Sequence, residues 1–165
     1  MVYNKFARRT GRVRPSSTEH MIMADRHDWL LQALARQRDG RLTPVQVQKI
    51  MFLMKMEAGR KVGRKFYDFE PYNYGPFCAD IYRDLEMLRD KEWLVIEKQG
   101  RSWNAYTITD QGRRAARAAS KGLDDTALDY LGKVTDWVTS LSFVDLLRAI
   151  YAKYPKFKKN SVFVG

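Results

Sequence analysis

The chain has 165 residues, of which 45% are hydrophobic, enough to build the core of one domain with a small extension. Its formal net charge of +11 favours an anionic partner. No apolar run approaches the roughly 18 residues of a membrane span, the basic N-terminus lacks the apolar centre of a secretory signal, and the single cysteine, Cys78, excludes an internal disulfide, so we expect a cytoplasmic protein.

The chain begins with a basic segment and a first helix. Residues 1–22 contain Arg, Gly, Pro and Ser without an apolar period, which indicates a flexible basic arm or a start-site extension. Residues 25–39 are expected to form a helix, with an apolar stripe that includes Trp29 and Leu34 and with Gly40 as its stop.

A second helix is expected to begin at Thr43 and Pro44. Thr43 suits the N-cap, Pro44 suits the first helical position, and Gln46 completes a capping box. Apolar residues widen one face of this helix, which therefore belongs at the centre of the domain. Its methionines are expected to fill the core, and they are Met51, Met54 and Met56.

Residues 66–77 form an aromatic segment. Pro71 and Pro76 exclude a regular helix there, so we expect an extended loop, with Pro76 at the start of the next helix. The aromatic side chains either fill the core beside that helix or line a binding groove, with at least one of Tyr72 and Tyr74 facing solvent.

A third helix over residues 76–91 and a pair of strands follow. Three apolar residues recur at helical spacing, namely Ile81, Leu85 and Leu88. Residues 94–96 and 106–108 are expected to be partner strands, with a turn at residues 100–102.

Three more helices are expected after the strands. Thr109 caps a helix that begins at residue 110, and two further helices span about residues 126–141 and 143–154, the last ended by Pro155. The acid pair Asp124 and Asp125 most simply starts the first of these two helices.

The order of helix, helix, helix, strand, turn, strand and helix fits a winged helix-turn-helix. We therefore predict a mainly α fold with a small antiparallel β-wing. It would comprise a winged-helix-like domain at residues 23–122 and a C-terminal helical extension at residues 123–165, packed on the same domain.

A narrower resemblance covers roughly residues 42–165. LTPVQVQKIMFLM, followed by PYNYGPFCADIYRDLEML and the closing YAKYPKFKKNSV, resembles the YwgA-like proteins and the related Panacea (SocA-like) antitoxin domain. The shared features are a Gln-Lys pattern at residues 42–49 and Tyr-Gly-Pro at residues 74–76. The resemblance implies a prokaryotic or phage module and, in the Panacea group, neutralisation of a toxin by direct protein contact.

Charge favours a protein partner over DNA. Residues 80–92 contain five acids and three bases, and a helical wheel puts Arg83, Glu86 and Asp90 on the exposed face. An acidic face is a poor reader of a DNA groove. We therefore predict a non-enzymatic interaction module that occludes a partner protein, such as a toxin, through the aromatic segment and this helix. The predicted partner-binding residues are Tyr72, Tyr74, Phe77, Tyr82, Arg83 and Glu86.

A DNA-binding transcriptional regulator is the alternative. The wing and the helix after it carry groups that suit backbone phosphate or simply form a solvated basic face, namely Lys98, Arg101, Trp103, Arg113, Arg114 and Arg117. The basic run at residues 60–65, with Arg36, Arg38 and Arg41 expected nearby, suits either phosphate or an acidic protein.

No catalytic constellation is recognisable, so we expect no enzyme activity, no metal and no cofactor. The two histidines, His20 and His27, lie in the weakest-patterned region, and no Gly-rich phosphate loop is present. Cys78 is either a buried inert thiol or, at a helix start, a thiol with a lowered pKa. The oligomeric state stays open, with a dimer among the possibilities, and the apolar residues 162–164 offer a docking point in a larger complex.

Overall fold

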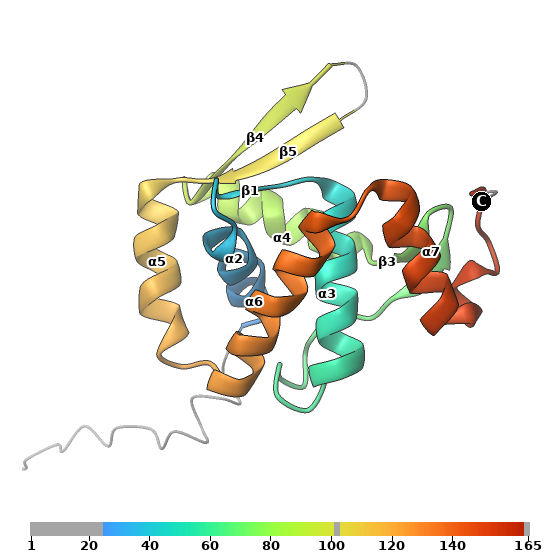
Figure 1. The fold of residues 1–165 in the computed structure, drawn as a ribbon. Helices are drawn as coiled ribbons and strands as arrows, with labels where there is room; N and C mark the ends of the chain where they lie inside the picture. The colour runs from blue at the N-terminus through green and yellow to red at the C-terminus, as the bar shows by residue number, and fades with distance from the viewer. Residues whose placement is uncertain (1–24, 101–102, 164–165) are drawn as a thin grey trace, which may run out of the picture.

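The computed structural model describes residues 25–100 and 103–163, so the expected basic arm at residues 1–22 lies outside the described residues. The described part is mainly helical, with small antiparallel sheets, which confirms the coarse fold class (Figure 1). None of its helices is long and apolar enough to cross a membrane.

Helix α2 (Arg26–Arg36) ends before residue 39, where the sequence predicts its end. Four residues after the end of the helix, Gly40 turns with a φ of 68° into strand β1 (Arg41–Leu42). This short strand pairs with strand β5 (Trp103–Ile108), and the carbonyl oxygen of Gly40 accepts a hydrogen bond from the N–H of Ile108 at 2.8 Å. The helix ends early because the chain must reach this sheet edge.

Helix α3 (Pro44–Ala58) lies at the centre of the molecule and packs against α2 and α6 (Figure 1). It begins with the predicted capping box. The backbone N–H of Gln46 donates to the Thr43 hydroxyl at 3.3 Å, and the backbone N–H of Thr43 donates to the Gln46 side chain at 2.9 Å. The sequence therefore predicted the start of this helix correctly.

The middle of α3 has no exposed face. All residues from 47 to 54 are buried, and they include Met51 and Met54 as expected. Met56 is 40% exposed, so the expectation that it fills the core is wrong. It lies in the last turn of α3, beyond the buried stretch.

The aromatic segment contains a β-hairpin where the sequence predicts an extended loop. Strands β2 (Glu70–Tyr72) and β3 (Gly75–Phe77) pair antiparallel, with Pro71 opposite Pro76. Because neither proline has an N–H to donate, this pair fits a ladder position without a hydrogen bond, and the hairpin tolerates both prolines. Two prolines therefore exclude a helix here without excluding strands.

Helix α4 (Ala79–Asp90) begins later than predicted. Pro76 belongs to β3, and Cys78 occupies the N-cap with extended backbone, so the prediction that Pro76 starts the helix is wrong. The three predicted core residues of this helix are all buried, namely Ile81, Leu85 and Leu88.

Strands β4 (Leu94–Gln99) and β5 form a hairpin that projects from the helical body (Figure 1). Their pairing runs from Leu94 opposite Ile108 to Gln99 opposite Trp103, so both strands are longer than predicted. Gly100 starts the connecting turn with a φ of 65°, as the sequence suggests. With β1, these strands make a three-stranded sheet in the order β1-β5-β4.

Helices α5 (Asp110–Ser120), α6 (Asp125–Ser140) and α7 (Phe143–Lys153) match the predicted helices closely, and Pro155 begins a short 3-10 helix, η1 (Pro155–Lys158). Each of these three α-helices begins at a side-chain cap, and the caps are Thr109, Asp124 and Ser142. Helix α5 packs on α2, whereas α6 packs on both α2 and α3. The division at residue 122 into a domain and an extension stays a prediction.

The segment after η1 returns to the turn between β2 and β3. The N–H of Val162 donates to the carbonyl oxygen of Asn73 at 3.0 Å. The Ser161 hydroxyl donates to the same oxygen at 3.3 Å and accepts from the Tyr151 hydroxyl at 2.6 Å. Residues 161 and 162 therefore contact the chain's own hairpin, and docking of the tail on another component stays a prediction.

Candidate functional site

Four of the predicted partner-binding residues are aromatic, and three of them form a continuous row. The Tyr72 ring stacks on Phe77, with centroids 4.8 Å apart and an interplanar angle of 29°. Phe77 in turn lies 5.7 Å from the ring of Tyr82 on α4. We call Tyr72, Phe77 and Tyr82 the aromatic row, which joins the β2–β3 hairpin to α4. Tyr74, at the hairpin turn, packs instead on Phe143 at 5.5 Å.

The two alternatives for the aromatic segment each hold for part of it. Phe66 and Tyr67 are buried in the core. Tyr72 is 48% exposed and Tyr74 is 47% exposed, which is a large fraction for aromatic side chains that are held by ring contacts. The hairpin therefore presents aromatic surface, while the residues that precede it fill the core.

The two charged partner-binding candidates lie on the exposed side of α4. Arg83 forms an ion pair with Asp80, and Glu86 is exposed one turn after Tyr82. The wheel correctly predicted that Arg83, Glu86 and Asp90 face solvent. The structure thus brings all six predicted residues to the β2–β3 hairpin and the adjoining helix.

A small pocket of about 120 Å³ lies against the aromatic row, between the hairpin, α3 and α4. We call it the Lys49 pocket. Its lining residues are Val45, Gln48, Lys49, Tyr72, Tyr74, Gly75, Phe77 and Tyr82. Gly75 adopts a φ of 86°, and a side chain placed there would meet the Cε atom of Lys49 at 3.5 Å. The Tyr-Gly-Pro corner therefore packs over the stem of this lysine.

Lys49 is only 3% exposed, an unusual state for a lysine. Its Nζ donates a hydrogen bond to the carbonyl oxygen of Pro76 at 3.1 Å. No carboxylate in residues 25–100 and 103–163 forms an ion pair with it. Burial lowers the pKa of Lys49 to about 7, because the charged form loses its hydration without gaining an anion.

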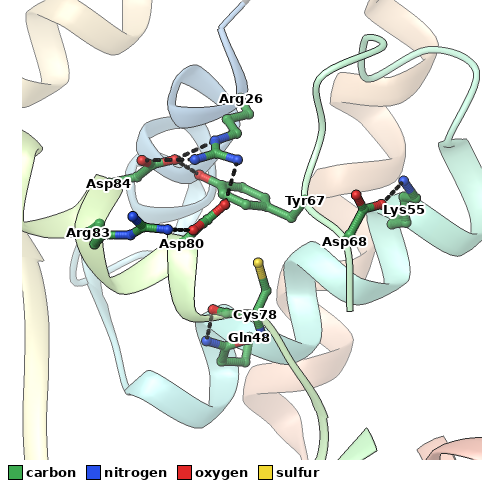
Figure 2. A network of polar contacts seen from close by, with 9 residues as sticks. All are labelled: Arg26, Gln48, Lys55, Tyr67, Asp68, Cys78, Asp80, Arg83 and Asp84. Atoms are coloured by element: carbon green, nitrogen blue, oxygen red, sulfur yellow. Dashed lines mark hydrogen bonds and ion pairs between the residues drawn. The ribbon is translucent and has the colours of Figure 1, made fainter. Parts of the chain in front are cut away.

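The neighbouring Gln48 has a structural task. Its amide donates to the carbonyl oxygen of Cys78 at 2.9 Å and accepts from the N–H of Cys78 at 2.9 Å (Figure 2). These paired hydrogen bonds fix the start of α4 against α3. Cys78 itself is buried, as one of the two alternatives expects, and burial raises the pKa of its thiol, so the alternative that the helix start lowers that pKa is wrong.

Sequence reasoning missed Lys49 as a site residue, although a signal was present. The run VQKIMFLM places one lysine inside a stretch whose other residues are almost all apolar. A helix that is apolar all round is buried all round, so a lysine within it has no exposed side to occupy. What the sequence does not reveal is that no carboxylate of the described residues pairs with this lysine.

A polar network joins α2, α4 and Tyr67 (Figure 2). The Nε of Arg26 donates to Asp84 at 2.8 Å, its Nη1 donates to Asp80 at 3.2 Å, and the Tyr67 hydroxyl donates to Asp84 at 2.7 Å. Burial and the hydrogen bond to Asp84 raise the pKa of Tyr67. Two of the five acids counted on this helix are thus held by Arg26, so the sequence count overstates how acidic the exposed face is.

The alternative, nucleic-acid-binding residues lie around the β4–β5 hairpin and α5, at the other end of the molecule from α7 (Figure 1). Lys98, Arg114 and Arg117 are exposed. Arg113 is half-buried, and its Nη1 donates to the carbonyl oxygen of Ala35 at 3.5 Å, so it has a packing role. Arg101 lies outside the described residues, and for Trp103 only the backbone is described.

Arg41 and the basic run at residues 60–65 lie at opposite ends of α3, which is about 22 Å long at 1.5 Å per residue over 15 residues, so the expected proximity of Arg41 to the run is wrong. Arg36 reaches α6, where its Nε donates to the carbonyl oxygen of Leu128 at 3.3 Å. Arg36 is also committed, since its Nη1 donates to Gln32 at 3.0 Å.

Two larger pockets lie elsewhere in the described residues, and their charged side chains are exposed or paired. One of about 550 Å³ lies between the end of α3, residues 59–61 and α6, and its Glu57 pairs with Lys153 and Tyr154. Another of about 320 Å³ lies between α3, α6 and α7 beside the exposed Trp137. Within residues 25–100 and 103–163, no three His, Cys, Asp or Glu side chains group closely enough to hold a metal ion.

No protein-family model matches the chain, and no curated protein matches it.

Proposed function

We propose that this protein is a non-enzymatic interaction module of the antitoxin or phage–host-conflict type. It binds and occludes a partner protein with the aromatic row, Tyr74 and the rim of the Lys49 pocket. The observation that supports this most is the joining of exposed tyrosines to a pocket that contains a buried, unpaired lysine. Aromatic side chains around a small pocket are typical of the energetic centre of a protein interface.

We also propose the finer fold and family on which this function draws. Helices α2, α3 and α4 followed by the β4–β5 hairpin follow the element order of a winged helix, with the β2–β3 hairpin added between α3 and α4. The resemblance to the YwgA-like and Panacea (SocA-like) families supports the antitoxin type, and its Tyr-Gly-Pro motif lies at the hairpin that covers Lys49. The order of elements alone says little about the ligand, so the main support for the proposal comes from the Lys49 pocket and the aromatic row.

The charges of α4 leave a mixed surface beside the row. With Asp80 and Asp84 engaged by Arg26, the exposed charges predicted from the wheel are Arg83, Glu86 and Asp90. This surface suits the polar rim of a protein interface, and it offers few bases to a DNA groove.

A site-specific photocrosslinker tests the proposal. The reactive side chain replaces Tyr74 in one variant and the exposed Ala118 on α5 in a matched control. Irradiation in cells is expected to give one stoichiometric crosslinked protein from position 74 and none from position 118. Purified partner should then lose at least tenfold in affinity for Tyr72→Ser. Equal crosslinks from both positions, or none from position 74, would refute the proposal.

A DNA-binding regulator remains the second candidate, because Lys98, Arg114 and Arg117 are exposed on the β4–β5 hairpin and α5. It predicts binding to duplex DNA that falls steeply with salt concentration. Arg114→Ala and Arg117→Ala are the suitable variants, since Arg113 contacts Ala35 and its removal would also affect folding. Weak, sequence-independent retention of DNA that neither variant changes would rule this candidate out.

A further inference from the structure

Lys49 is a buried lysine whose presence in the core needs an explanation. A buried ammonium group is costly unless an anion or several acceptors replace its hydration. In residues 25–100 and 103–163, its hydrogen-bond partner is one neutral carbonyl oxygen, that of Pro76 at 3.1 Å. A methionine or leucine would fill the same space without this cost, so packing does not explain a lysine at this position.

The walls of the Lys49 pocket leave room for one small anionic group. Its volume of about 120 Å³ corresponds to about four water molecules at roughly 30 Å³ each. Gln48 gives one of its two amide N–H groups to Cys78 and accepts from Cys78 with its oxygen, so one N–H of Gln48 is left as a neutral donor. The groups that can meet a ligand are therefore the lysine nitrogen, this N–H and the tyrosines that line the pocket.

The titratable groups that face Lys49 from neighbouring elements are phenols. Tyr72 and Tyr74 come from the β2–β3 hairpin, and Tyr82 comes from α4. From α7, Tyr151 approaches the position that a side chain on Gly75 would occupy, next to the Cε atom of Lys49. A phenol can donate a hydrogen bond to an anion, and none of these groups brings a positive charge.

We infer that the Lys49 pocket binds a single carboxylate group, supplied by an Asp or Glu side chain of the partner protein. The identity of the donor rests on the proposed function, whereas the carboxylate chemistry rests on the pocket alone. One ammonium group balances one negative charge and donates to one or both carboxylate oxygens. A phosphate group is a poorer match, because its higher charge is ordinarily met by several donors or an arginine fork.

Carboxylate binding makes the lysine take up a proton. The nearby anion favours the charged form, so the pKa of Lys49 rises from its lowered value when the site is filled. NMR of the full chain with ¹³C at the lysine Cε reports this pKa directly. The Lys49→Met variant identifies the Lys49 signal and removes a buried charge, so it is expected to fold.

The probes are N-acetyl-glutamate N-methylamide, the aspartate equivalent and the neutral glutamine equivalent. The two acidic probes are expected to raise the pKa of Lys49 by about one or more, and the glutamine probe is expected to leave it unchanged. Indistinguishable responses to the glutamate and glutamine probes would overturn the inference. A stronger response to N-acetylglycine, which presents a C-terminal type of carboxylate, would overturn the assignment to a side chain, and a stronger response to inorganic phosphate would overturn the carboxylate chemistry.

This outcome is separable from that of the crosslinking experiment. If the glutamate probe binds and position 74 yields no crosslinked protein, the carboxylate site stands and the protein-binding function fails. If position 74 captures a partner and the acidic probes leave Lys49 unchanged, the function stands and the carboxylate site fails.

Discussion

The side-chain nitrogen of Lys49 lies 3.1 Å from the carbonyl oxygen of Pro76, and this hydrogen bond links the centre of α3 to the Tyr-Gly-Pro corner of the hairpin. Both partners are buried, and the hairpin residue Gly75 lies between them and α7. A hydrogen bond between a lysine and a neutral oxygen holds the hairpin in place but only partly replaces the lost hydration of the charge.

The first prediction concerns the pH dependence of stability. The pKa of Lys49 is about 7 in the folded state, against an ordinary value of 10.5, so the unfolded chain binds more protons between these pH values. The free energy of unfolding should therefore rise with pH across this window, by up to about 5 kcal/mol from this group. Below pH 7 the cost of burying the charged form of Lys49 is fully present, and above pH 10.5 it is absent.

Lys49→Met should remove this slope and raise the free energy of unfolding at pH 7 by about 2–4 kcal/mol, since the variant also loses the hydrogen bond to Pro76. Urea unfolding of the wild type and the variant between pH 6 and 10 measures both effects. Lys133→Met, at an exposed position on α6, is the matched control and should run parallel to the wild type. Parallel curves for Lys49→Met would contradict the prediction.

The second prediction concerns the paired hydrogen bonds of Gln48. Replacing it by Leu leaves the N–H of Cys78 buried without a partner, at about 1–3 kcal/mol, and leaves the carbonyl oxygen of Cys78 only its bond from the N–H of Ile81. We expect Gln48→Leu to lower the free energy of unfolding by about 2–4 kcal/mol. Gln111→Leu, at an exposed position on α5, should change it by less than about 0.5 kcal/mol. Similar urea midpoints for the two variants would show that the paired bonds contribute little.

The third prediction compares two ion pairs drawn in Figure 2. A double-mutant cycle on Arg26 and Asp84, whose side chains are largely buried, should give a coupling free energy of about 1–3 kcal/mol. The exposed pair of Lys55 and Asp68, at 3.0 Å, should give less than about 0.5 kcal/mol. Thermal or urea unfolding of the single and double variants yields both numbers. Equal coupling in the two cycles would mean that burial does not set the strength of these pairs.

The fourth prediction concerns two glycines in helices. A methyl group at Gly112, in the first turn of α5, would overlap the carbonyl oxygen of Trp93, so Gly112→Ala should cost about 2–3 kcal/mol. At Gly132 in α6, the nearest atom is the Nε of Arg36 at 3.8 Å, an ordinary contact. Gly132→Ala should therefore stabilise the protein by about 0.5–1 kcal/mol, through helix propensity. Calorimetric melting temperatures should move in opposite directions, and a shared direction would contradict the geometry.

Local signals predicted most of the helices. The capping box of Thr43 and Gln46 and the caps at Thr109 and Asp124 act over three or four residues, so a reading of neighbouring residues finds them. The β2–β3 hairpin escaped prediction because Pro71 and Pro76 argue against strands unless they face each other, and their register is set by the fold.

The candidate site was predictable in part. The exposed tyrosines and the solvent-facing side of α4 follow from sequence patterns, as do Ile81, Leu85 and Leu88 on its buried side. The pairing of Asp80 and Asp84 with Arg26 depends on contacts across more than 50 residues of chain, so a segment-by-segment charge count misses it. The unpaired state of Lys49 could not be predicted, because it depends on which residues pack around α3 on every side.

The contact between residues 161–162 and Asn73 means that the hairpin turn is completed late in the synthesis of the chain. Ribosomes synthesise the β2–β3 hairpin long before Ser161 and Val162, which hold its turn through Asn73. Domains fold from their N-terminal parts as synthesis proceeds at about 5–20 residues per second. The hairpin turn beside the Lys49 pocket thus gains its last contacts some seconds after its own residues emerge. In the nascent chain, Tyr72 and Tyr74 are therefore present before residues 161 and 162 can fix the hairpin turn.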